Sequence, residues 1–171
     1  VYVKFKINKS LDFARDTQGN NSSHCFLVWT TTHWTLPANT ALAVGPEIDY
    51  VQIRAAKDYD PSQTKKSDFD TADTLILAKS RLGVIKGAYH IEREFKGKDL
   101  IGAEYEPLYV FPGMVCPVDL ASGEKACCFT VVGADFISTE DGTGIVHIAP
   151  AFGEDDMQTA KKNNLSTLLT V

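Results

Sequence analysis

The chain has 171 residues, of which 44% are hydrophobic and 23% are charged, and its formal net charge at pH 7 is −5. This size and composition are typical of one globular domain with a buried core. The acidic balance disfavours a protein that grips nucleic acid over a broad basic surface, but it leaves open a site that takes only the end of an RNA chain.

The pattern of apolar residues predicts many short strands. Residues 1–8 alternate apolar with polar side chains, which predicts a strand with one wet face. Residues 10–23 are polar and predict a loop, and residues 25–32 predict a central strand that ends before Pro37, because proline has no backbone N–H to donate. Further strands are expected at residues 40–44, 50–54, 74–78, 89–95, 127–132, 145–149 and 165–171, with a mobile loop at 57–70, a helical turn at 79–82 and an irregular or edge strand at 102–110.

One longer helix is predicted, over residues 153–162. Its first turn is acidic and its last turn contains Lys161 and Lys162, which suits the helix dipole at both ends. Asn163 or Asn164 can serve as a left-handed cap. Many short strands with few helices predict a mainly β fold, a closed β-barrel of short strands with a few peripheral helices.

The four cysteines give no C-x-x-C pair, so a zinc site is not expected and the thiols are predicted to be reduced. No apolar run is long enough to cross a membrane and no signal-peptide pattern is present, so we expect a cytoplasmic protein with no membrane partner. The chain does not begin with Met, and we expect residues 1–171 to be a single domain excised from a larger protein.

Two segments near opposite ends of the chain carry the chemistry. Residues 29–41 read Trp-Thr-Thr-Thr-His-Trp-Thr-Leu-Pro-Ala-Asn-Thr-Ala, with three hydroxyl side chains in a row between two indoles. Residues 141–156 read Asp-Gly-Thr-Gly-Ile-Val-His-Ile-Ala-Pro-Ala-Phe-Gly-Glu-Asp-Asp. Together they resemble the two signatures of the editing domain of isoleucyl-tRNA synthetase, which is inserted in the class I synthetases for isoleucine, valine and leucine. His33 departs from the family pattern, which has proline there.

The resemblance implies roles for individual residues. Asp156 matches the aspartate that holds the ammonium of the bound amino acid, although its place in the first helical turn is also where acids complement the dipole. His147 matches the histidine that lines the pocket and excludes isoleucine, and pocket lining is favoured over general base catalysis, although a lone histidine flanked by Ile145 and Ala149 is more often a core residue than a catalyst. The family threonines around the scissile ester correspond to Thr30, Thr31 and Thr32, and the remaining substrate-binding candidates are Trp34, Asn39 and Ala149.

The implied activity is hydrolysis of valine wrongly attached to isoleucine tRNA, after and possibly also before transfer to the tRNA. The implied partners are the 3′ end of the aminoacylated isoleucine tRNA, its valine moiety and the remaining domains of the synthetase. No metal or cofactor is expected for this domain, although a full-length synthetase would use ATP and Mg²⁺. The ATP-site signatures of that family are absent, so this chain is not expected to activate amino acids.

Two other functions stay open. A valyl-type editing domain would clear threonine instead, but valyl and leucyl domains usually carry Thr-Thr-Arg-Pro in the first segment, where this chain has Thr32 in the Arg place. A non-catalytic module that binds an aminoacyl group or an RNA end would keep the pocket without turnover. On sequence alone, His24, His33 and His90 are expected to lie on the surface or in loops.

Overall fold

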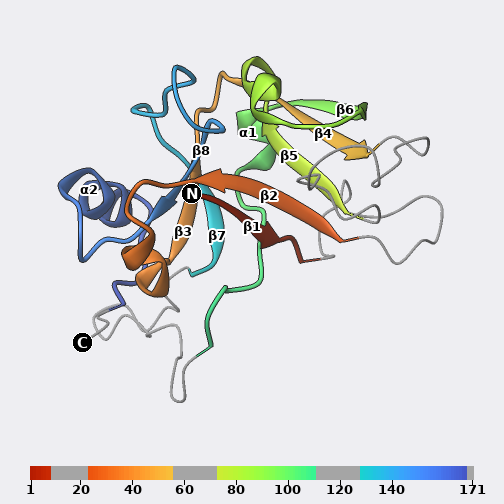
Figure 1. Ribbon diagram of the computed structural model, residues 1–171. Coiled ribbons are helices and arrows are strands. Elements are labelled where there is room, and N and C mark those ends of the chain that lie inside the picture. The colour runs from red at the N-terminus through yellow and green to blue at the C-terminus, as the bar shows by residue number, and fades with distance from the viewer. Residues whose placement is uncertain (9–22, 56–72, 111–127, 169–171) are drawn as a thin grey trace.

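The structure is a computed structural model that describes residues 1–8, 23–55, 73–110 and 128–168 (Figure 1). The predicted loop at 57–70 and nearly all of the one at 10–23 lie outside these ranges. The elements of the described residues are the strands β1 (Tyr2–Lys6), β2 (His24–Trp29), β3 (Ala41–Val44), β4 (Asp49–Ala55), β5 (Thr74–Ala78), β6 (Tyr89–Lys96), β7 (Thr130–Gly133) and β8 (Ile145–Ile148), the α-helices α1 (Gly97–Leu100) and α2 (Glu154–Lys162), and the 3₁₀ helices η2 (His33–Ala38) and η3 (Lys79–Val84).

The strands form two sheets. The larger has five strands in the order β1-β2-β5-β4-β6, and the smaller has three in the order β7-β3-β8. Among the described strands, only β2–β5 and β3–β7 pair in parallel, and the two strands of each pair lie far apart in the sequence, as parallel pairing requires. The chain leaves β2, passes through η2 and returns as β3, so the threonine segment joins the two sheets (Figure 1).

Residues 102–106 connect the sheets on another side. The Glu106 amide donates to the Lys6 carbonyl at 2.7 Å, and the Tyr105 amide donates to the Phe129 carbonyl at 2.9 Å. Isolated bridges join Ile7 to Tyr105 and Glu104 to Thr130. The mainly β prediction is therefore confirmed, but the closed barrel is not. The described strands form two sheets, which the irregular segment 102–106 connects through hydrogen bonds.

Three apolar clusters explain why so many strands are buried on both faces. One lies between the sheets and includes Phe5, Leu42 and Ile145. A second, including Leu75 and Leu77, covers the opposite face of the larger sheet beneath η3. The third fills the space between the smaller sheet and α2, with Ala41, Ala43, Ile148 and Ala160 among its members.

The longer helix agrees with its prediction. α2 covers Glu154–Lys162, and Asn164 follows it with φ of 50°, the left-handed conformation expected of a cap. The shorter turn at residues 79–82 is also present, as the 3₁₀ helix η3, but it extends past Gly83 to Val84. The helix α1 is a single turn that begins directly after β6.

Other predictions are wrong. The central strand ends at Trp29 rather than at Thr32, and Pro37 lies inside η2, where its fixed φ is tolerated because 3₁₀ geometry is short and local. Residues 166–168 form no strand. His24 is buried rather than superficial, since its Nδ1 lies 2.7 Å from Thr74 Oγ1 across the β2–β5 pair.

The cysteine prediction also needs correction. Cys25 is a free buried thiol, and burial raises its pKa to about 11. Cys128 is disulfide-bonded, so the expectation of a reduced thiol is wrong at this position. Among the described residues, no helix combines the length and the apolar character needed to cross a membrane.

Candidate functional site

The three threonines form a turn rather than the end of a strand. The Thr32 amide donates to Thr30 Oγ1 at 3.1 Å, and the two hydroxyl oxygens lie 3.4 Å apart. A side chain that captures a backbone N–H two residues on competes with the strand ladder, which explains why β2 stops at Trp29. Thr30 is buried, whereas Thr31 and Thr32 are exposed residues at the surface.

His147 meets this turn from the other end of the sequence. It lies on β8 opposite Leu42, and its Nε2 is 3.2 Å from Thr35 Oγ1. The Thr35 hydroxyl donates its only hydrogen to the Thr32 carbonyl at 2.8 Å, so it accepts from His147, which assigns the Nε2–H tautomer. Nδ1 is buried and has no hydrogen-bond partner within the described ranges.

The surroundings keep His147 neutral. Burial lowers the pKa of its imidazole below 6.5, and the negative charge of Asp156 opposes that shift only in part. A protonated ring would also place a second N–H where the described residues offer no acceptor. The side chain can therefore fill space and exchange hydrogen bonds at neutral pH, but it adds no positive charge to the site.

Asp156 is half-buried in the first turn of α2 and is held in place. Its Oδ2 accepts the Ala149 amide at 2.9 Å, immediately after β8. A side chain at Gly153 would approach the carboxylate to about 3.3 Å, so the glycine leaves room for it. One carboxylate oxygen of Asp156 is thus fixed by the backbone.

Two of the remaining candidates differ sharply in environment. Asn39 is 4% exposed, and both ends of its side-chain amide form hydrogen bonds within the protein. Nδ2 donates to the Ala41 carbonyl at 2.7 Å, and Oδ1 accepts a hydrogen bond from the Tyr105 hydroxyl at 2.6 Å. Trp34 is 66% exposed, with the His33 ring edge-on to it at a centroid distance of 5.3 Å. The Asn39 amide therefore connects two parts of the fold, whereas the Trp34 ring is accessible to a ligand.

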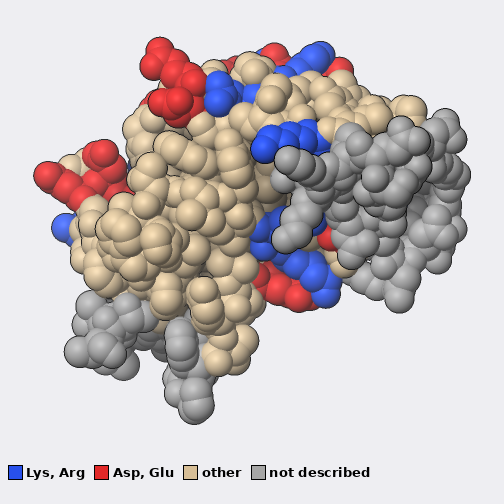
Figure 2. Space-filling view, viewed as in Figure 1, with Lys and Arg blue, Asp and Glu red and all other residues tan. Residues whose placement is uncertain are grey.

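The surface around the threonine turn carries little charge. Figure 2 shows a broad face over β2 and η2 with few charged side chains, and acidic and basic groups gather at its margins. The exposed aromatic rings of Trp34 and Phe152 come from the two signature segments. An uncharged rim with exposed rings suits a ligand that is itself partly apolar.

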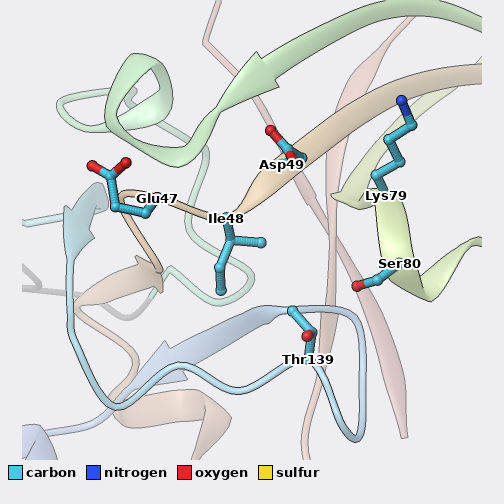
Figure 3. Close-up of a pocket in the computed structure, with 6 residues that line it drawn as sticks. All are labelled: Glu47, Ile48, Asp49, Lys79, Ser80 and Thr139. Atoms are coloured by element: carbon cyan, nitrogen blue, oxygen red, sulfur yellow. The ribbon is translucent and has the colours of Figure 1, made fainter.

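A separate hollow of about 440 Å³ contains none of the predicted site residues. It lies among the start of β4, η3 and the β7–β8 loop, and Figure 3 shows Ser80 and Thr139 at its lower side and Glu47 opposite. Two of the charged side chains that line the hollow already form ion pairs: Lys79 with Glu94 at 2.8 Å and Asp49 with Lys96 at 2.7 Å. The candidate site is therefore the threonine turn and β8, which the contact between Thr35 and His147 brings together.

Comparison with known proteins identifies the family. The chain is 40% identical over 165 residues to the isoleucine–tRNA ligase of Clostridium acetobutylicum and 44% identical over 149 residues to that of Treponema pallidum. These matches cover 96% and 83% of this chain. The chain is homologous to one segment of the isoleucine–tRNA ligases. It spans 12% of the length of each of these two relatives, and no protein-family profile matches it.

Solved structures give the fold of that segment. GlLeuRS-CP1 matches with a TM-score of 0.61 at 16% identity, over 95% of this chain and 60% of that one. The editing domain of the cytosolic leucyl-tRNA synthetase of P. knowlesi matches with a TM-score of 0.63 at 14% identity, over 94% and 62%. The fold of this chain is therefore similar to that of the leucyl-tRNA synthetase editing domains.

Sequence reasoning missed two residues that organise the site. Thr35 joins the two segments through His147, and Tyr105 holds Asn39. Thr35 has a sequence signal, because it lies in the quoted signature between Trp34 and Leu36. Tyr105 has none, since its partner is 66 residues away.

Proposed function

We propose that this chain is an aminoacyl-tRNA deacylase that hydrolyses valine from mischarged isoleucine tRNA and excludes isoleucine by the size of its pocket. The observation that carries the proposal is the 3.2 Å contact between Thr35 Oγ1 and His147 Nε2, which joins segments 112 residues apart. Homology to the isoleucine–tRNA ligases and the editing-domain fold support the same reading.

The need for such an activity follows from the energetics of small apolar differences. One missing methylene changes binding by only about 1–3 kcal/mol, a limit for which isoleucyl-tRNA synthetase is itself the standard example. A second pocket that admits valine but is too shallow for isoleucine removes the error by size. In this proposal His147, buried and held by Thr35, sets the depth.

The proposed mechanism uses no protein nucleophile. Asp156, fixed through the Ala149 amide, holds the α-ammonium of the amino acid in a charge-assisted hydrogen bond. Neutral His147 lines the pocket without repelling that ammonium. Thr30, Thr31 and Thr32 orient the ester, the attacking water and the terminal ribose, and a substrate hydroxyl takes part in proton transfer.

The test is Asp156→Asn, which removes the charge but can still accept the Ala149 amide. We expect kcat/KM for deacylation of valyl-tRNA to fall by about 10- to 100-fold, because a hydrogen bond to a charged group contributes about 1.5–3 kcal/mol. Asp155→Asn is the matched control, since Asp155 is an exposed acid in the same helical turn. Unchanged deacylation by Asp156→Asn would remove the central assignment.

A further inference from the structure

Tyr105 is a buried phenol that lies outside both signature segments. It is 1% exposed, and its ring packs edge-on against Phe5 and Phe129 at centroid distances of 5.3 and 6.0 Å. Burial raises the pKa of its hydroxyl well above 10, so the group stays protonated and donates. Its hydrogen bond goes to Asn39 Oδ1 at 2.6 Å.

This bond settles how the Asn39 amide is oriented. An amide with its oxygen on the phenol must turn its nitrogen the other way. Nδ2 accordingly donates to the Ala41 carbonyl at 2.7 Å and lies 3.5 Å from the Ile148 carbonyl. The same Ile148 carbonyl accepts the Thr40 amide at 3.0 Å.

The Ile148–Ala149 peptide group connects this arrangement to the site. Its carbonyl faces Asn39 and Thr40, and its N–H donates to Asp156 Oδ2 at 2.9 Å. Because a peptide group is planar, fixing its carbonyl also fixes the direction of its N–H. Hydrogen bonds in series also polarise one another, so donors to the carbonyl strengthen the N–H of the same peptide group as a donor.

We infer that Tyr105 is a positioning residue for Asp156, acting through Asn39 and the Ile148–Ala149 peptide group to aim the carboxylate at the ammonium of the bound amino acid. The inference rests on the proposed function, which gives Asp156 that role. It assigns Asn39 to the relay rather than to direct contact with substrate, since both ends of its amide are engaged.

The experiment compares two non-hydrolysable ligands, a valyl-adenosine analogue and the same molecule without its α-amino group. Tyr105→Phe keeps the ring and removes only the hydroxyl. We expect it to weaken binding of the amino ligand by about 5- to 10-fold and to change binding of the deamino ligand by less than about twofold, because only the first uses the aimed carboxylate. Asn39→Ala removes the next link and must give the same ammonium-specific loss.

Tyr50→Phe is the matched control. Tyr50 is equally buried, and its hydroxyl bonds the Gly45 amide at 3.0 Å and the Gly144 carbonyl at 2.6 Å, outside the relay. It should not distinguish the two ligands. Equal weakening of both ligands by Tyr105→Phe, or unchanged binding of both, overturns the inference. If Asp156→Asn loses binding of the amino ligand but Tyr105→Phe does not, this inference alone is overturned. If the wild-type protein binds the amino and deamino ligands equally well, the proposed function is overturned as well.

Discussion

At the scale of single residues, His147 makes stability depend on pH. Burial lowers the pKa of its imidazole in the folded protein, whereas the unfolded chain takes up the proton near pH 6.5. The stability contributed by this group is therefore complete above pH 6.5 and is lost as the pH falls through the lower folded value. Denaturant titrations at about pH 7.5 and about pH 5.5 should give a larger drop in unfolding free energy for wild type than for His147→Gln. His90→Gln, at an exposed position, should keep the wild-type drop, and an equal drop in His147→Gln would contradict the account.

At the scale of elements, the loop between β7 and β8 is pressed against the end of β2. Gly142 has φ of 69°, and a Cβ there would lie 2.7 Å from the Trp29 ring, while Arg81 donates to the Gly142 carbonyl at 2.8 Å. Gly142→Ala should therefore cost both left-handed backbone strain of about 1–2 kcal/mol and a steric clash. Gly102→Ala isolates the first cost, because Gly102 has φ of 87° with nothing within 4 Å of the added Cβ. Equal losses of unfolding free energy in the two variants, measured by denaturant titration, would show that the Trp29 contact is unimportant.

At the scale of the whole molecule, several of the described lysine side chains are paired with carboxylates rather than clustered in one basic patch. The formal net charge is −5, and in the described part of the chain Lys4, Lys6, Lys79 and Lys96 each pair with a carboxylate. A chain that takes only the 3′ end of a tRNA would neutralise few phosphates, so a plot of log binding constant against log salt concentration should have a slope of about −1 to −2. Titration of a non-hydrolysable aminoacyl-tRNA at several salt concentrations measures this slope. A slope steeper than about −5 would indicate a broad basic grip instead.

Local patterns in the sequence predicted the elements best. Alternation placed β1, a continuous apolar run placed β5, and acidic and basic ends with an asparagine cap placed α2, because these signals act within a few residues. The end of β2 was missed, since the bond from the Thr32 amide to Thr30 Oγ1 wins over the strand propensity of threonine.

Contacts between distant segments could not be derived from pattern alone. The resemblance of residues 29–41 and 141–156 to one family's signatures led us to expect that they meet, and the contact of Thr35 with His147 agrees with that expectation. The burial of His24 depends on Thr74 and Gln52 across neighbouring strands, and the two-sheet arrangement depends on residues 102–106; neither has a local signal. The catalytic roles of Thr30, Thr31, Thr32 and Asp156 stay predictions.

The most direct measurement is the rate at which the protein deacylates isoleucine tRNA charged with valine and the same tRNA charged with isoleucine. We expect rapid release of valine and release of isoleucine slower by about 10-fold or more, because the longer side chain meets His147. Release of both amino acids at the same rate, or release of neither, would contradict it.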